Sequence, residues 1–110
     1  MSHLRSEETD IKKETKEALE ACGYLVRRVH SGKVKSRHGG WMVLAEAGTA
    51  DLVVQGLCFT AWLELKTEKG SFSDEQELFA GEITRRGGNY LTARSCAEAV
   101  EKVRAIGAAS

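Results

Sequence analysis

The chain has 110 residues, of which 42% are hydrophobic and 29% charged, as in a single globular domain. Its 16 basic and 16 acidic side chains balance, which excludes a strongly basic protein, the simplest indication of nucleic-acid binding. The three cysteines form no CxxC pair, which argues against a zinc site, and their odd number and apolar or small neighbours predict buried, reduced thiols. With no signal peptide and no apolar run of about 18–20 residues, we expect a cytoplasmic protein.

The first part of the chain predicts a helix, two strands and a basic loop. Apolar or small side chains at helical spacing predict a helix over residues 7–22, which Gly23 ends. Residues 24–30 are rich in β-branched and aromatic side chains and predict a strand. Residues 31–40 contain three glycines and no acidic residue, so we expect a loop, and the apolar Trp41–Ala45 predicts a short strand.

The second part predicts a hairpin followed by a helix, a strand and a helix. Residues 51–55 and 60–66 are strand-like and are joined by a short glycine-containing link. Ser73 and Gln76 match a capping box that begins a helix ending near Arg86. Asn89–Ala93 predicts a strand, and residues 96–106 a final helix. This order predicts a single α/β domain over residues 1–110, with a mixed sheet flanked by helices.

The hairpin brings charged residues to one end of the predicted sheet. Asp51 opens one strand, and Glu64 and Lys66 project together near the end of the next, because residues two apart share a face. Two converging carboxylates could hold a divalent cation, with the Leu65 backbone carbonyl as a third oxygen ligand. Lys66 would then orient a water or offset phosphate charge. The alternative is a surface ion pair between Glu64 and Lys66 on a half-exposed strand.

This pattern resembles the signature of PD-(D/E)xK nucleases, and its details resemble the VRR-NUC branch, the virus-type replication-repair nuclease domain. The matching segments cover nearly the whole chain: Glu8-x-x-Ile11, Gly23, Arg28-Val29-His30-Ser31-Gly32, Gly48-Thr49-Ala50-Asp51-Leu52, Leu63-Glu64-Leu65-Lys66 and Gly70-Ser71-Phe72-Ser73-x-x-Gln76. Ala50 departs from the family, which more often has proline before the aspartate. The resemblance implies a restriction-endonuclease-like αβββαβ core in a minimal, stand-alone form.

The resemblance also implies roles for individual residues. Asp51 and Glu64 would bind Mg²⁺ or Mn²⁺, and Lys66 would assist catalysis. Gln76 would lie at the edge of the site near the scissile phosphate, although in a capping box the same side chain satisfies a backbone N–H, and both can hold.

A further carboxylate from the first helix would complete the site. The resemblance implies Glu8 for this position, and Glu7 is the other candidate. The alternative for both is a solvated helix surface or a favourable charge in the first turn.

Basic residues concentrate between residues 22 and 45, where no acidic residue occurs. This segment is a candidate contact for the DNA backbone, and the alternative is a solvated loop. The candidate DNA-binding residues are Arg27, Arg28, His30, Lys33, Lys35, Arg37 and, further along the chain, Lys69, with Arg85 and Arg86 as a possible extension.

Taken together, the resemblance implies a Mg²⁺- or Mn²⁺-dependent endodeoxyribonuclease in replication, recombination or repair. One site cuts one strand, so symmetric cleavage of a branched duplex favours a two-fold homodimer. Stand-alone domains of the family resemble Holliday-junction resolvases, so we expect a homodimer that cleaves four-way junctions. A phage or a bacterial genome could encode it. The alternatives are a nuclease for flaps, nicked or linear DNA, and a non-catalytic module that docks DNA or a replication partner.

Overall fold

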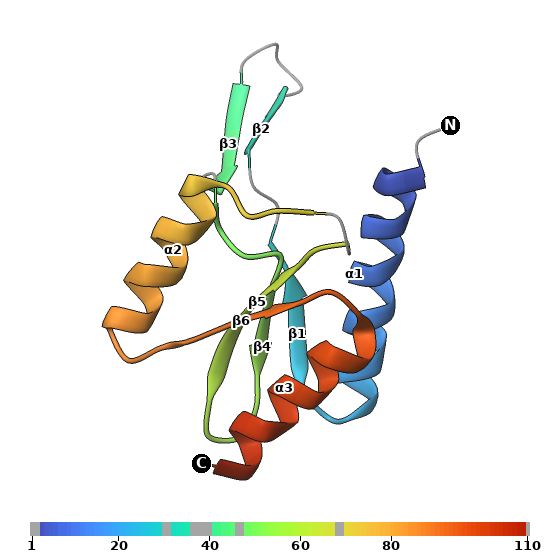
Figure 1. The fold of residues 1–110 in the computed structure, drawn as a ribbon, viewed down its shortest axis with the longest axis vertical. Coiled ribbons are helices and arrows are strands. Elements are labelled where there is room, and N and C mark those ends of the chain that lie inside the picture. Colours follow the sequence, from blue (N-terminus) through green and yellow to red (C-terminus); the bar gives the residue numbers. More distant parts are fainter. Residues whose placement is uncertain (1–2, 30–31, 36–40, 46–47, 68–69, 110) are drawn as a thin grey trace.

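The computed structural model describes residues 3–29, 32–35, 41–45, 48–67 and 70–109 (Figure 1). Side chains are described for residues 10–29, 48–67 and 70–109. In chain order the elements are α1 (His3–Ala21), β1 (Leu25–Arg28), β2 (Gly32–Lys35), β3 (Trp41–Ala45), β4 (Leu52–Gln55), β5 (Thr60–Leu65), α2 (Asp74–Arg85), β6 (Asn89–Ala93) and α3 (Cys96–Ala109). The predicted α/β class is confirmed. No helix in these ranges has both the length and the apolar character needed to cross a membrane.

The central sheet has the strand order β1-β4-β5-β6. Strands β4 and β5 pair antiparallel, as the predicted hairpin, with Leu52 opposite Leu63. Strand β1 is antiparallel to β4, whereas β6 is parallel to β5, so the sheet is mixed as expected. In an antiparallel pair one step back on β4 is one step forward on β5. The register therefore puts Asp51, just before β4, level with Glu64.

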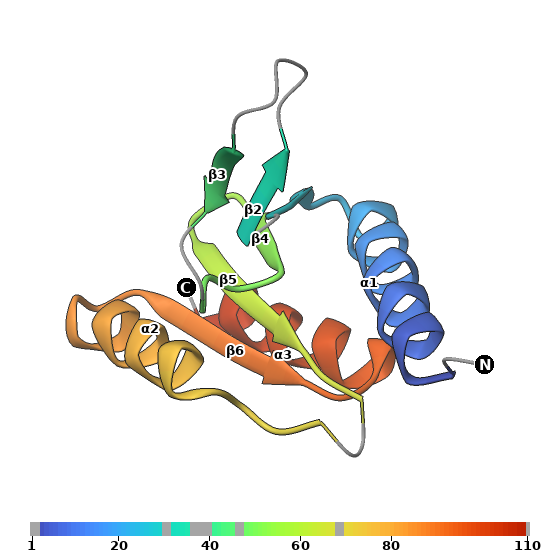
Figure 2. The same ribbon diagram turned by 90° about the horizontal axis from the view of Figure 1, so that it is seen from above.

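Different helices cover the two faces of this sheet (Figure 2). The apolar core lies between one face and helices α1 and α3, and its fully buried members include Leu19, Val26, Leu52, Val54, Ala61, Leu63, Ala99 and Val103. On the other face Phe79 of α2 packs edge-on against Trp62 and Tyr90, with ring centroids 5.2 and 6.0 Å apart. Because Glu64 lies two residues after Trp62, it shares this second face.

The structure corrects part of the prediction of a loop over residues 31–40, of which residues 31 and 36–40 lie outside the described residues. Gly32–Lys35 forms β2, which pairs antiparallel with β3 and places Lys35 opposite Trp41. Figure 1 shows this two-stranded sheet projecting beyond the central sheet. A four-residue strand with one glycine and two lysines has little intrinsic β preference, so its structure comes from pairing with the apolar β3.

The prediction of buried cysteines is wrong. Cys22 and Cys58 are exposed, and Cys96 is partly buried, and all three are free thiols. Cys22 directly follows α1, and Cys58 lies in the turn between β4 and β5. Side chains at such connections face water, whatever the apolar character of their neighbours in the sequence.

Candidate active site

Asp51 and Glu64 lie together at one end of the β4–β5 hairpin. Oδ2 of Asp51 accepts a hydrogen bond from the backbone N–H of Leu65 at 2.8 Å. This bond ties the aspartate to the strand that carries Glu64. The other oxygen, Oδ1, lies 3.2 Å from Nζ of Lys12 on α1, so an ammonium group also reaches the aspartate.

Glu64 is a buried carboxyl group, with 2% of the residue exposed. Its Oε1 accepts a hydrogen bond from Nε2 of Gln76, whereas Oε2 is buried with no hydrogen-bond partner in the described part of the chain. Burial is the main cause that raises the pKa of Glu64 from 4.5 to about 8; Asp51 raises it further, and Lys66 opposes the shift. A solvent-exposed ion pair between Glu64 and Lys66, the alternative considered from the sequence, is therefore excluded.

These two carboxylates suit a divalent cation. A buried carboxylate oxygen without a partner is costly, and a second negative charge beside it adds to the cost. Mg²⁺ and Mn²⁺ prefer carboxylate and carbonyl oxygens, and a bound cation would satisfy the Glu64 oxygen and offset both charges. The Leu65 backbone, predicted to supply a third oxygen, is at the same place through its contact with Asp51.

The structure does not describe the side chain of the carboxylate that was predicted from the first helix. Glu8 and Glu7 belong to α1, but their side chains lie outside those that the structure describes. Among the described side chains, no group of three or more His, Cys, Asp or Glu residues comes together. Of the predicted metal ligands, the structure thus describes Asp51, Glu64 and the Leu65 backbone.

Gln76 forms the predicted capping box and also contacts Glu64. Its backbone N–H donates to Oγ of Ser73 at 3.2 Å, and its Oε1 accepts from the Ser73 backbone N–H at 2.8 Å, which completes the predicted capping box of α2. The amide nitrogen of the same side chain donates to Glu64. The start of α2 therefore holds the orientation of the buried carboxyl group.

Lys66 directly follows β5 and stays attached to the sheet. Its backbone N–H donates to the carbonyl of Ala93 on β6 at 3.0 Å. Its Nζ lies 5.7 Å from the centre of the Phe72 ring, and its charge lowers the pKa of Glu64. The structure thus gathers Asp51, Glu64, Lys66 and Gln76 at one end of the sheet.

Sequence reasoning missed two side chains near this pair, Lys12 and Tyr90. The hydroxyl of Tyr90 is buried with no hydrogen-bond partner among the described residues. Burial is the largest cause that raises the pKa of Tyr90, followed by the charges of Glu64 and Asp51, so the phenol stays protonated beside the carboxylates. Lys12 precedes Thr15, which is buried in the structure, by three residues and so shares its helix face.

The structure describes the side chains of only some of the predicted DNA-binding residues. Arg27 and Arg28 are exposed on β1, and Nη1 of Arg27 donates to the carbonyl of Val26 at 2.9 Å. Lys33 and Lys35 belong to β2, but their side chains are not among those described, and His30, Arg37 and Lys69 lie outside the described residues.

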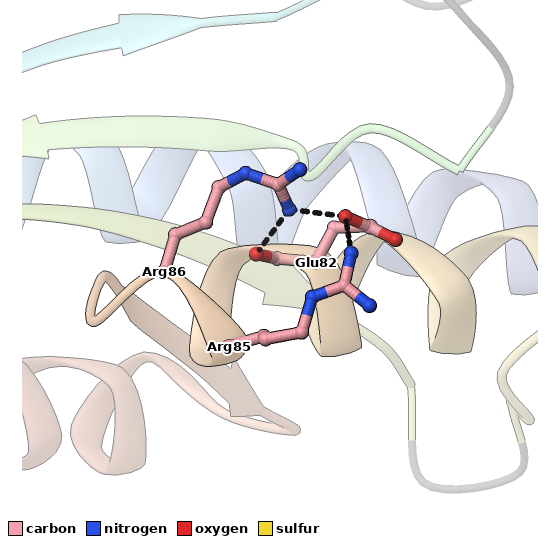
Figure 3. A network of polar contacts seen from close by, with 3 residues as sticks. All are labelled: Glu82, Arg85 and Arg86. Carbon is pink, nitrogen blue, oxygen red and sulfur yellow. Dashed lines mark hydrogen bonds and ion pairs between the residues drawn. The ribbon is translucent and has the colours of Figure 1, made fainter.

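Arg85 and Arg86 form ion pairs with Glu82 at the end of α2 (Figure 3). The hydrogen bond from Arg86 is the largest cause that lowers the pKa of Glu82. Glu82 therefore offsets part of the positive charge of both arginines, which makes them a weaker extension of the basic surface than their sequence indicates.

A comparison with solved structures identifies the fold. A solved chain named VRR_NUC domain superposes on this chain with a TM-score of 0.66, at 24% sequence identity, covering 89% of this chain and 95% of that chain. The sequence matches no family model and no curated protein. The chain therefore has the VRR_NUC fold that its sequence pattern indicated.

Proposed function

We propose that this protein is a metal-dependent endonuclease that hydrolyses phosphodiester bonds in DNA. Its active site would be formed by Asp51, Glu64 and Lys66. The observation that carries the proposal is the buried Glu64 carboxyl group, which has a second carboxylate beside it and one oxygen with no hydrogen-bond partner among the described residues. The VRR_NUC fold supports the same function. A module that only bound DNA would gain nothing from two carboxylates where phosphates must approach.

Asp51 and Glu64 would hold Mg²⁺ or Mn²⁺, together with the Leu65 carbonyl and Glu8. A cation bound there would polarise the phosphodiester and lower the pKa of a water molecule for attack on phosphorus. The Leu65 N–H and the Gln76 amide each bind one carboxylate oxygen. Oε2 of Glu64, which has no hydrogen-bond partner in the part of the chain that the structure describes, would remain for the cation. Such supporting hydrogen bonds fix the direction of the ligands.

Lys66 would act on the phosphate. As water attacks in line, the new phosphorus–oxygen bond forms while the bond to the leaving sugar oxygen breaks, and negative charge grows on the phosphate oxygens. The Lys66 ammonium would offset this charge or position the water. Arg27 and Arg28, exposed on β1, would contact phosphates away from the cut, with His30, Lys33, Lys35, Arg37 and Lys69 as the other predicted contacts.

For the substrate, we propose a four-way DNA junction cleaved by a homodimer. Each chain supplies one carboxylate pair, which cuts one strand, and paired cuts across a junction need two copies related by a two-fold axis. Flaps, nicked DNA and linear DNA are the competing substrates, and DNA binding without cleavage is the competing function.

Cleavage of end-labelled DNA tests these proposals. Four-way junction, flap and linear duplex are incubated with Mg²⁺, Mn²⁺ or EDTA and with the wild type or Glu64→Gln. The control is Glu101→Gln, an exposed glutamate on α3. We expect paired nicks near the branch point, absent in EDTA, unchanged in the control and reduced about 100-fold or more in Glu64→Gln.

Other outcomes distinguish the proposed nuclease activity from the proposed substrate. Cleavage of linear DNA alone would keep the nuclease and reject the junction substrate. Binding without cleavage in either metal would reject the enzyme. Calorimetric titration with Mn²⁺ gives a separate readout, because the wild type should bind the ion and Glu64→Gln should not.

A further inference from the structure

Gly70, which follows β5, packs against the side chain of Lys66. The backbone N–H of Gly70 donates to the carbonyl of Thr67 at 3.0 Å, which closes a turn. A Cβ added at Gly70 would lie 3.3 Å from Cδ of Lys66, so the turn packs on the aliphatic part of the lysine. A larger residue at Gly70 would push against this side chain.

Arg94, directly after β6, holds this turn closed. Its Nη1 donates to the carbonyl of Thr67 at 2.5 Å and to the carbonyl of Gly70 at 2.7 Å. Both bonds cross from the residue after β6 to the residues that follow β5. A single guanidinium group therefore joins both ends of the turn to the neighbouring strand.

Phe72 completes the arrangement around the lysine. The centre of its ring lies 5.7 Å from Nζ of Lys66 and 5.7 Å from Cζ of Arg94. Both distances are within the range of cation–π attraction. The ring thus attracts the ammonium group at its free end, while the turn restrains the middle of the side chain.

We infer that Arg94 and Phe72 are positioning residues for Lys66, which direct its ammonium group toward the scissile phosphate. This inference deepens the proposed nuclease function and rests on it. A free lysine side chain samples many rotamers, and this conformational freedom is lost when the ammonium group contacts the transition state. The turn, the Phe72 ring and the Arg94 guanidinium restrict Lys66 to one conformation before DNA binds, which favours the reaction by preorganisation.

Nuclear magnetic resonance of the metal-free protein tests the positioning without any cleavage. With ¹³C-labelled lysine, the Cε–Hε signal of Lys66, assigned through Lys66→Arg, should be shifted by the Phe72 ring. Phe72→Leu should remove the shift, and Arg94→Gln should reduce it. Arg104→Gln, which changes an exposed arginine of α3, should leave it unchanged. A wild-type signal at the position of a free lysine would overturn the inference.

Single-turnover cleavage tests the functional half. Phe72→Leu and Arg94→Gln should each slow cleavage about tenfold, with DNA affinity in Ca²⁺ changed less than about twofold. In a Lys66→Met background neither change should slow the reaction further, because both act through the lysine. Equal losses in the two backgrounds would overturn the inference. If no substrate is cleaved, the nuclease proposal fails. The chemical shift of the Lys66 signal still tests whether Phe72 and Arg94 position the Lys66 side chain.

Discussion

Burial of Glu64 sets how the folded protein responds to pH. Its pKa is 4.5 in the unfolded chain and about 8 in the folded one, so between these values the folded state holds a proton that the unfolded state has released. The stability that this proton contributes is fully present below pH 4.5 and is lost as the pH rises through about 8. In metal-free protein we expect a decrease of at most about 1.4 kcal/mol per pH unit from this group.

Urea unfolding in EDTA at several pH values measures this decrease. Glu64→Gln carries no titrating proton and should flatten the profile over the same range. Glu101→Gln is the control, because Glu101 is exposed and should leave the profile unchanged. A slope that persists in Glu64→Gln would assign the pH dependence to other groups.

Lys12 brings a positive charge to the aspartate that would bind the metal. Its Nζ is 3.2 Å from Oδ1 of Asp51, so a divalent cation on this carboxylate meets a like charge. Lys12→Met keeps the aliphatic stem, and we expect it to raise Mn²⁺ affinity roughly three- to tenfold in calorimetric titration. Lys16→Met is the matched control, because Lys16 pairs with Glu20 one turn further along α1. Weaker Mn²⁺ binding in Lys12→Met would show instead that Lys12 holds Asp51 in its binding geometry.

Whether a site residue could be predicted depends on how far its position is set by local pairing. Asp51 and Glu64 meet because a tight turn fixes the register of one hairpin, and the sequence contains all of that information. Lys12 and Tyr90 come from α1 and β6, and Arg94 follows β6. Their approach depends on how distant elements pack, which a short pattern cannot specify.

At the scale of elements, the capping box links the stability of α2 to the candidate active site. Ser73→Ala removes the Oγ that accepts the Gln76 N–H, and we expect a loss of about 1 kcal/mol in urea unfolding. Because the Gln76 side chain is then less restrained against Glu64, Mn²⁺ affinity should also fall severalfold.

Ser95→Ala is the matched control for this substitution. Oγ of Ser95 accepts the backbone N–H of Glu98 at 3.1 Å at the start of α3, so its removal should cost a similar amount of stability. Mn²⁺ binding should stay unchanged in this variant. A fall in affinity in both variants would mean that general loosening of the fold, and not the position of Gln76, weakens the site.

Elements with a strong periodic or apolar pattern were predicted well. Strand β6 has the predicted bounds, and α3 begins at the predicted Cys96 but continues to Ala109. Helix α1 begins at His3, four residues before the predicted start. Strand β2 was missed because its existence depends on β3 and not on its own residues.

At the scale of the whole molecule, one apolar core between the sheet and helices α1 and α3 supports the fold. Leu63 is fully buried in this core, and Leu63→Ala should lower the free energy of unfolding by about 3 kcal/mol. Leu57 is fully exposed in the turn between β4 and β5, so Leu57→Ala should change the free energy of unfolding by less than about 0.5 kcal/mol. Urea denaturation of both variants measures the difference, and equal losses would contradict this placement of the core.

The mixed character of the sheet followed from the order of the predicted elements, but its full topology did not. The hairpin pattern gave the antiparallel β4–β5 pair. The parallel position of β6 beside β5 requires α2 to cross from one end of the sheet to the other, and the position of β1 beside β4 requires a contact between distant strands. These pairings are decided by burial of the common core.

Helix α2 buries fewer side chains against the rest of the molecule than the other two helices do. None of its 12 residues, all of which the structure describes, is fully buried, whereas α3 buries Ala99 and Val103. Elements with little buried surface open locally at a lower free energy than global unfolding requires. In deuterium exchange we therefore expect the amides of α2 to exchange before those of α3, and equal rates would contradict this.

The start of α2 provides Gln76, which lies against Glu64. Each local opening of this helix would withdraw that amide and expose the carboxyl group to solvent. The helix that orients Glu64 would thereby also act as its gate, so that the opening frequency of α2 limits how quickly a cation enters or leaves the site.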